Sequence, residues 1–400
     1  MERRTFLKVI GGVSAMAICS CKGSVDAAQT RGTGNPPASG GQAPVFLAGI
    51  KRGVSEEAMK SAVRAAAEAA TDFSWLSKGA AVFIKPALNS GNPYPATTSP
   101  IAIAAMVELL KQKGAGRVIV GDMSGIQHIK LSPNGATGSS RRLMESCGMA
   151  RIVQQAGAEV HFFEEAGWGA FYEDSPVAGS HWKSGLMTPN ILKEVEHIIL
   201  MPRCGRHVLA GSSLGLKAAV GYWRTDTRLE YHRDASTFQE KTAEGNTVET
   251  LRNKQRLVLS AADKILTTFG PDNGHVYQPE TGLAIASESV VAHDMVSLAW
   301  LLQNRSKIPP SEKDCWFKDP YDSQLIVNFV NKYYIVRKLG GWGSAFASEK
   351  LYRKDINTIW DDRVLNRAYQ VLGGKPKVIL QAANDAVPED LRNRINEMVT

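Results

Sequence analysis

Short apolar runs alternate with helix-like segments along most of the chain. The runs at 80–84, 117–120 and 195–201 are almost continuously apolar, which is typical of strands buried inside a sheet. The segments 55–71 and 99–113 instead begin with helix start signals, a serine followed by two glutamates or by a proline. This regular alternation predicts βαβ units and a parallel sheet. We therefore expect an α/β fold, a mostly parallel sheet with helices on both faces and a helical C-terminal extension.

The same pattern places the remaining elements. Further strands are expected at 45–50, 159–163, 264–269, 283–286 and 378–381. Further helices are expected at 139–156, 247–262, 290–302, 324–339, 362–372 and 389–399. The polar links 123–138 and 224–245 are long enough to be functional loops. The main α/β domain would occupy 44–305, and the extension at 306–400, with its terminal strand, would pack on it.

One stretch, 197–222, runs from a strand into a basic loop. Its apolar run at 198–201 is stopped by Pro202, which cannot donate to a sheet ladder, and the strand is expected to be central. The side chains that follow are Arg203, Arg206 and His207. A basic loop is therefore predicted at the end of a buried strand.

A helix is predicted directly after this loop. Ser212 or Ser213 would be its N-cap, and Lys217 would lie one turn further on. A helix N-terminus presents free backbone N–H groups and the positive end of the helix dipole, so basic side chains beside it favour an anion. The alternative is that the serine only caps the helix and that the arginines are solvated.

Polar residues follow four of the expected strands. In open parallel sheets, ligands bind beyond the carboxyl ends of the strands. The residues predicted there are Lys85, Asn89, Asp122, Arg203, His207 and Asp272. We expect them to surround one site, although a single charge at a strand end is more often simply solvated.

The first residues have the pattern of an export signal. The string from Arg3-Arg4 to Lys8 resembles the twin-arginine motif, with Glu2 where Ser or Thr is usual. The apolar run that follows, 9–19, is shorter than the roughly 20 residues that span a bilayer. Residues 1–21 are therefore predicted to be a signal that the twin-arginine export machinery reads and that is removed.

Cys21 follows Ser20 in a string that resembles the lipoprotein cleavage box. Lipidation of Cys21 would hold the protein on a membrane surface, in the periplasm or on the outer face of the envelope. The alternative is an ordinary signal cut near 25–28. Residues 22–43 are rich in Gly, Pro, Ser and Ala, which predicts a flexible tether.

Charge and cysteine content narrow the function classes. The net charge of +8 is spread along the chain with no basic run beside aromatics, so no nucleic-acid partner is expected. The three later cysteines, Cys147, Cys204 and Cys315, are far apart, and the absence of a CxxC pair argues against a cysteine-built iron–sulfur or zinc site. A disulfide between two of the three stays open. Cys204 is read as a small buried residue in preference to a nucleophile.

Several motifs together resemble the domain-of-unknown-function family 362. They are Ile84-Lys85-Pro86 with Asn89, residues 96–100, Gly121-Asp122, residues 201–221, His232, Gly270-Pro271 with Gly274, and residues 287–294. The chain departs from the family pattern at Ala87, Ala218 and Ser289-Val290, and at 203–206, where the family is rich in lysine. The ferredoxin-like cysteine module of many relatives is absent. The resemblance implies a divergent, cluster-free branch, and it implies no particular activity.

Three hypotheses of different classes remain. The first is an enzyme that acts on a small anionic substrate, held by Lys85, Asn89, Arg203, Arg206, Ser213 and Lys217. His207 or His232 would move a proton, because an unperturbed histidine pKa suits transfer near neutral pH. Asp294 or Asp122 would orient that histidine, and Asp122 with Asp272 would be candidate ligands of a divalent cation. The others are a non-catalytic envelope protein that binds a small anion and an assembly partner with a vestigial pocket; the sequence names no cofactor.

Overall fold

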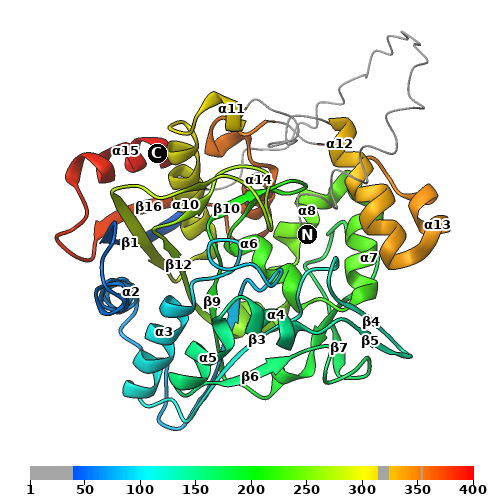
Figure 1. Ribbon diagram of the computed structural model, residues 1–400, viewed down its shortest axis with the longest axis horizontal. Helices are drawn as coiled ribbons and strands as arrows, with labels where there is room; N and C mark the ends of the chain where they lie inside the picture. The colour runs from blue at the N-terminus through cyan, green and yellow to red at the C-terminus, as the bar shows by residue number, and fades with distance from the viewer. Residues whose placement is uncertain (1–38, 314–323, 353–354) are drawn as a thin grey trace. The chain divides into compact units, whose positions relative to one another are not determined.

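An eight-stranded sheet organises the protein, whose computed structural model describes residues 39–313, 324–352 and 355–400. The strand order is β16-β1-β15-β12-β9-β2-β3-β6. β15 is antiparallel to both of its neighbours, and the other neighbouring strands are parallel. The bounds are β1 Ser39–Lys51, β2 Ala81–Pro86, β3 Arg117–Asp122, β6 Glu159–Phe162, β9 His197–Met201, β12 Gln255–Ala262, β15 Thr281–Ser287 and β16 Lys375–Ala382. The predicted α/β fold with a mostly parallel sheet is confirmed (Figure 1).

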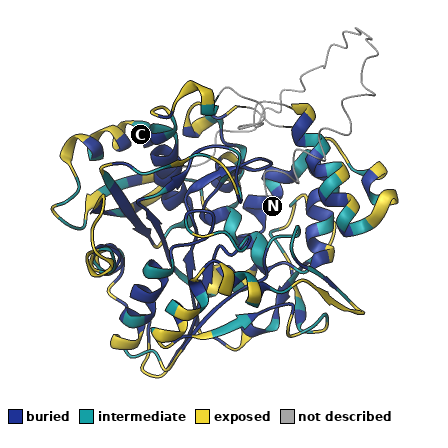
Figure 2. Cartoon of the chain, viewed as in Figure 1, coloured by how far each residue is buried: buried dark blue, intermediate teal, exposed yellow. Residues whose placement is uncertain are grey.

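Helices cover both faces of this sheet. Successive residues of a strand point to opposite faces, so Ala48 and Leu47 of β1 belong to two different apolar clusters. The first cluster includes side chains of α2 Glu56–Ala70, α3 Pro100–Gln112, α4 Ser140–Ser146 and α5 Met149–Gln155. The second includes side chains of α10 Val290–Arg305, α14 Arg363–Val371 and α15 Glu389–Val399. The central strands β2 and β9 are completely buried between the two layers, and β12 and β15 nearly so (Figure 2).

Smaller elements beyond the central strands carry most of the candidate site residues. A second sheet has the order β11-β10-β13-β14, with β10 Gly205–His207, β11 Gly211–Ser213, β13 Ile265–Leu266 and β14 Val276–Tyr277. Between β11 and β13 the chain forms α6 Gly215–Ala218, η2 Ala219–Tyr222, α7 Thr225–Arg233, η3 Ala235–Thr237, α8 Phe238–Glu244 and α9 Glu249–Lys254, ahead of β12. Two hairpins complete this part, β4 Lys130–Ser132 with β5 Gly135–Thr137 and β7 Phe171–Asp174 with β8 Leu186–Pro189, which leads into η1 Asn190–Lys193.

The C-terminal region is helical and returns to the main sheet at its end. It contains α11 Pro310–Lys313, α12 Gln324–Phe329, the π-helix η5 Val330–Val336, α13 Arg337–Ala347 and η6 Ile359–Asp361. η5 and α13 pack against α7 (Figure 1). β16 then pairs in parallel with β1 at the edge of the sheet, so this region completes the fold of the main domain.

Several secondary-structure predictions were wrong. The helix expected at 247–262 is the short helix α9 followed by strand β12, which lies between β9 and β15 in the sheet. The loop expected at 224–245 is largely helical, as α7 and α8. The strand expected at 264–269 is reduced to β13, and the helix expected at 139–156 is divided at Gly148, whose φ of 78° is incompatible with a continuous helix.

The predicted export signal, the predicted lipidation site Cys21 and residues 22–38 of the predicted tether lie outside the described residues, as does Cys315. Residues 39–43, which the sequence assigns to the tether, form the start of β1 and pair there with β16. In the described part of the chain, no helix is both long and apolar enough to cross a bilayer. Cys147 and Cys204 are both free thiols.

Candidate functional site

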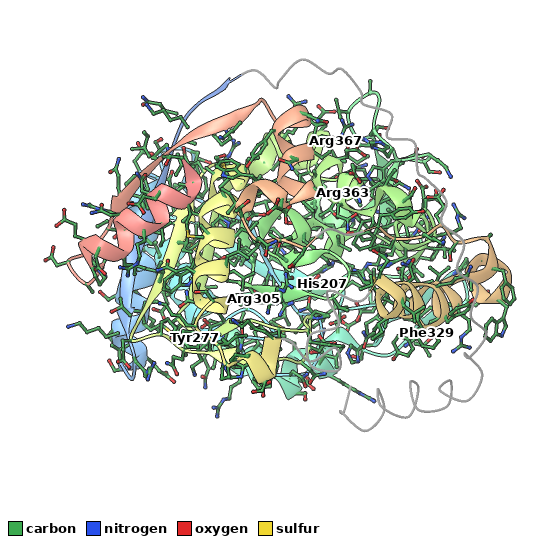
Figure 3. The ribbon with its side chains drawn as sticks, turned by 90° about the horizontal axis from the view of Figure 1, so that it is seen from above. His207, Tyr277, Arg305, Phe329, Arg363 and Arg367 are labelled. Carbon is green, nitrogen blue, oxygen red and sulfur yellow. The ribbon has the colours of Figure 1, made fainter. Side chains whose placement is uncertain are left out.

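A cavity of about 110 Å³ lies at the carboxyl ends of β2, β3 and β9. We call it the basic cavity, because several cationic side chains line it. Of the residues predicted from sequence, it is lined by Lys85, Asn89, Asp122, Arg203, His207, Ser213, Lys217, His232 and Asp272. Arg206 and Asp294 are buried but do not line it. Figure 3 shows His207 in the interior of the fold, away from the outer helix that carries Phe329.

A buried ion pair forms the floor of the basic cavity. The Lys85 Nζ lies 2.8 Å from Asp122 Oδ1, and both side chains are at most 5% exposed. The two remaining contacts of Asp122 are backbone N–H groups, since Leu88 donates to Oδ2 (2.9 Å) and Met123 to Oδ1 (2.8 Å). Burial lowers the pKa of Lys85, although Asp122 raises it in part. The pair joins neighbouring strands β2 and β3 and is already fully coordinated by protein groups.

Arg203 is completely buried beside the cavity and is held by oxygen atoms. Its guanidinium donates from Nε to Ser213 Oγ (3.2 Å) and from Nη1 to the Pro271 carbonyl (2.7 Å). Burial lowers its pKa to about 10, while Asp272 acts in the opposite direction. Ser213 therefore orients Arg203 and does not cap a helix.

Lys217 projects into the cavity without a partner. None of the described residues forms a hydrogen bond or ion pair with its amine. Its pKa is lowered to about 7, first by burial and then by the positive charges of Arg203, Arg228 and Lys85. Lys217 is therefore the cation in this cavity whose charge is least compensated by the protein.

Arg228 and His128 line the cavity but were missed by the sequence analysis. Arg228 donates to the carbonyls of Ser124 (2.7 Å), Met123 (2.8 Å) and Gly221 (2.9 Å), and burial lowers its pKa to about 10. It lies one turn before His232 on α7. Their i, i+4 spacing places both on one helical face, a signal that was hidden because 224–245 was read as a loop.

The short helix α6 positions Lys217, but its N-terminus is not an anion site. The predicted serine cap was wrong: the N-cap is Leu214, and neither Ser212 nor Ser213 bonds to the helix. Asp294 of α10 takes this role, because its carboxylate accepts from the N–H groups of Gly215 (2.8 Å) and Leu216 (2.7 Å). The free amides on which the anion prediction depended are thus already satisfied by a carboxylate of the protein itself.

Two glycines allow this helical segment to approach the buried charges. A Cβ on Gly215 would lie 2.7 Å from Asp294 Oδ1. A Cβ on Gly221 would lie 2.4 Å from Lys85 Nζ and 2.5 Å from Asp122 Oδ1. Only a residue without a side chain therefore fits at either position.

His207 and His232 differ in which ring nitrogen carries the proton. His207 Nδ1 accepts from the N–H groups of Leu209 (3.1 Å) and Ala210 (3.2 Å), so the proton of its neutral ring is on Nε2. The His232 Nδ1 lies 2.8 Å from Asn331 Oδ1, which requires a proton on Nδ1 and leaves Nε2 as an acceptor. Burial lowers the His232 pKa to about 3, so its ring is neutral at neutral pH.

Asp272 and His128 line the cavity, and each has a buried polar atom without a hydrogen-bond partner among the described residues. In the described structure, Asp272 Oδ1 and His128 Nε2 are buried without a hydrogen bond, and the His128 Nε2 lies 3.8 Å from Asp272 Oδ2. No group of three or more potential metal ligands occurs among the described residues. Because Asp122 is engaged by Lys85 and two amides, Asp272 is the carboxylate of the cavity with an acceptor oxygen still available.

The remaining candidates, Asn89, Arg206 and Cys204, are held by contacts within the protein. The Asn89 side chain donates to the Ala96 carbonyl (2.9 Å), which fixes the turn after β2. Arg206 is buried on β10, and its carbonyl accepts weakly from Arg203 (3.5 Å). Cys204 is buried in the second apolar cluster, and burial raises the pKa of its thiol, as expected for a packing residue.

Comparison with known proteins gives a family match and several distant structural matches. The family model described as a domain of unknown function, DUF362, matches residues 82–299. No curated protein matches the chain. The lactate racemase apoprotein from Thermoanaerobacterium thermosaccharolyticum aligns with a TM-score of 0.38 and 13% identity, over 62% of this chain and 54% of that chain. A Thermotoga maritima protein solved by a structural genomics consortium aligns with a TM-score of 0.38 and 14% identity, over 59% and 56%. The chain thus spans just over half the length of each of these structures.

The family match includes the site. Residues 82–299 contain strands β3, β9 and β12 and nearly all of β2. They also contain every residue that lines the basic cavity, apart from Val330 and Ile335 of the C-terminal region. The chain therefore belongs to the DUF362 family, whose domain has no established function.

Proposed function

We propose that the protein is an enzyme that moves a proton to or from a small anion held in the basic cavity, with Lys217 as the acid–base group. The observation on which this proposal rests is the unpartnered Lys217 amine, which lies among cations that are already held by the protein. A binding site for an anion needs uncompensated positive charge, and an acid–base group needs a pKa near the working pH. Lys217 meets both requirements.

The charge balance of the cavity favours an anion. The cations are Lys85, Arg203, Lys217 and Arg228, and the carboxylates that line the cavity are Asp122 and Asp272. Asp122 is paired with Lys85, and the arginines are held chiefly by neutral carbonyl oxygens, which do not cancel their charge. A bound anion would relieve the repulsion that lowers the Lys217 pKa. Asp272 Oδ1 would accept a hydrogen bond from a hydroxyl or amine of the same ligand.

The chemistry favours Lys217 over the histidines as the proton-transfer group. With a pKa of about 7, its amine and ammonium forms coexist at neutral pH, so it can take a proton from the substrate and return it. His232, with a pKa of about 3, is a weak base, and its Nε2 is better suited to accept a hydrogen bond from the substrate. His232 would therefore orient the ligand.

The size of the cavity limits the ligand. An apolar cavity of about 150 Å³ holds benzene, so a cavity of about 110 Å³ fits a slightly smaller molecule. Inorganic phosphate, sulfate and carboxylates of two to four carbons are in this range. We therefore propose a short carboxylate or a small oxyanion as the substrate class.

Proton-linked calorimetry tests the binding step. Sulfate and acetate do not titrate near pH 8, so a proton taken up when either binds must go to the protein. We expect up to one proton per bound anion at pH 8, measured as a dependence of the binding heat on the ionisation enthalpy of the buffer, because an anion raises the Lys217 pKa from about 7. Lys217→Met should abolish the uptake, and replacement of the exposed Lys78 should not. Binding by wild type without any proton uptake would contradict the role of Lys217.

A turnover assay separates the enzyme from a binding protein. Wild type would be incubated in D₂O with a panel of short hydroxy-, oxo- and amino-carboxylates and small phosphate esters. Proton NMR would then show consumption or exchange of a substrate proton for deuterium. We expect turnover of at least one compound by wild type and none by Lys217→Met. Saturable, proton-linked binding without turnover would instead identify a non-catalytic anion-binding protein.

We also propose that the protein acts outside the cytoplasm, held on a membrane surface through lipidated Cys21. Support comes from the Arg3-Arg4 pair, the short apolar run after it and the Ser20-Cys21 string. The tether from Lys22 onward would separate the folded domain from the lipid.

A further inference from the structure

The C-terminal helical segment 324–347 exposes large aromatic side chains. Trp342 and Phe346 of α13 are 55% and 66% exposed, and their rings are stacked with centroids 5.7 Å apart. Tyr333 of η5 is exposed as well. We call these three residues the aromatic face. Single exposed apolar residues are common on protein surfaces, whereas neighbouring large aromatics mark an interaction site.

Two cations are interleaved with the aromatic face. The Arg337 guanidinium lies 5.1 Å from the centroid of Trp342, and its Nε donates to the Tyr333 carbonyl (3.0 Å). The Lys332 amine lies 5.7 Å from the ring centroid of Tyr333 and 3.4 Å from the Phe346 carbonyl. These contacts join the five residues into one connected patch. The sequence from Gln324 to Ser348 contains no Asp or Glu, so the patch has no acidic side chain of its own segment to neutralise it.

The inner side of the same segment is fixed to the domain. Val327, Val336 and Leu339 are buried, and η5 and α13 pack against α7. Figure 2 shows exposed residues on the outer side of these helices and buried residues on the inner side. The segment is therefore amphipathic, with an apolar inner side that already has its partner and an aromatic, cationic outer side that has none among the described residues.

We propose that the aromatic face, together with Lys332 and Arg337, binds the surface of a bilayer that contains anionic lipid. Tryptophan and tyrosine side chains favour the interface between headgroups and acyl chains. Amphipathic helices with basic residues beside bulky apolar ones bind in that interface. The acidic headgroups supply the negative charge that this segment lacks. The proposal depends neither on the activity of the basic cavity nor on lipidation of Cys21.

The charges of the patch favour lipid over a second copy of the chain. In a twofold contact through this patch, both facing surfaces would carry Lys332 and Arg337, and like charges that face each other across an interface oppose association. An anionic bilayer has the complementary sign. Two cations near such a surface correspond to roughly 10- to 30-fold tighter binding than to a neutral bilayer.

Vesicle sedimentation tests this proposal. The full chain would carry Cys21→Ala, so that acylation cannot contribute, and would be mixed with vesicles of phosphatidylcholine alone or with phosphatidylglycerol added. We expect at least tenfold tighter binding to the anionic vesicles, weakened by salt. Trp342→Ala with Phe346→Ala should reduce the binding at least tenfold, and Lys332→Gln with Arg337→Gln should remove the preference for anionic lipid.

A matched control is available elsewhere on the surface. Trp360 is 36% exposed and lies beneath the Lys375 amine, 3.7 Å from its ring centroid, so it reproduces an aromatic residue paired with a cation. Trp360→Ala should bind vesicles as the parent does. Unchanged circular dichroism and Tm would show that each variant is folded.

Two results would overturn the proposal. One is equal vesicle binding by the parent and the folded Trp342/Phe346 double variant. The other is a parent that ignores vesicles but forms a dimer, measured by analytical ultracentrifugation, that the double variant does not form. The second result would identify the aromatic face as a protein interface.

Discussion

Replacement of Lys217 by methionine is expected to stabilise the folded protein while removing its response to anions. Methionine has a similar length and fills the same space without a charge. In the wild type, the folded protein must hold an ammonium group among Lys85, Arg203 and Arg228. A side chain that lowers the stability of the fold and yet lines a cavity is consistent with a functional role, because functional groups often reduce stability.

The size of the effect follows from the pKa. Its decrease from 10.5 to about 7 corresponds to roughly 5 kcal/mol for charging a fully buried amine. Lys217 is only partly buried and remains open to the cavity, where solvent screens the charge, so we expect a gain of about 2 kcal/mol in the free energy of unfolding. This gain should be largest below pH 7, where the amine is protonated in both the folded and the unfolded chain. Between pH 7 and 10.5 only the unfolded chain keeps the proton, so the wild type gains stability with rising pH and the difference should shrink.

Urea unfolding at pH 6, 7, 8 and 9 would measure the difference between the two proteins, with replacement of the exposed Lys78 by methionine as control. The control should differ little from wild type at every pH. A Lys217→Met protein that is less stable than wild type at pH 6 would refute this reasoning. A gain of the same size at all four pH values would refute it too, because the destabilisation caused by the buried ammonium group must disappear when the amine loses its proton.

Three further predictions concern other parts of the chain. Asp294→Ala should lower the free energy of unfolding by about 3 kcal/mol in urea titrations, because two buried N–H groups of α6 lose their acceptor; Ser212→Ala should have little effect. Acid should destabilise wild type more than His232→Gln as pH falls from 6.5 towards 3, measured by urea unfolding, since the folded protein opposes protonation of this ring. Cys21→Ala should move the protein from the membrane fraction to the soluble envelope fraction, detected by immunoblotting, and unchanged fractionation would exclude Cys21 as the main anchor.

Local sequence signals predicted the regular elements well where the relevant interactions lie within a few residues. Ser55 and Ser99 were expected to cap helices, and each side-chain oxygen accepts from the N–H three residues on, that of Ala58 and of Ala102. The continuous apolar run before Pro202 predicted a central strand, and β9 lies between β12 and β2. Helix caps and strand ends depend on residues that are neighbours along the chain, so they can be predicted from the sequence.

The polar composition of a segment led to a wrong prediction where its charged residues are buried as ion pairs. The segment 224–245 was read as a loop because it is rich in charge, yet Lys241 is fully buried, with its amine 3.2 Å from Glu230 and 3.5 Å from Asp234. The error at 247–262 has a related cause. An apolar run such as that of β12 suits a buried helix or a buried strand, and its place between β9 and β15 decided the outcome.

By itself, the sequence identified most of the strand ends and the polar residues that follow them, and so predicted most of the charged side chains that line the basic cavity. Only the tertiary structure decided which charges are satisfied. Asp294, 79 residues from Gly215 in the sequence, accepts hydrogen bonds from the helix N-terminus that had been expected to bind an anion. Asp122 forms an ion pair with Lys85, whereas Lys217 has no partner among the described residues. The physical reason is that electrostatic energy depends on distance through space and on burial, and neither quantity is written in the spacing of residues along the chain.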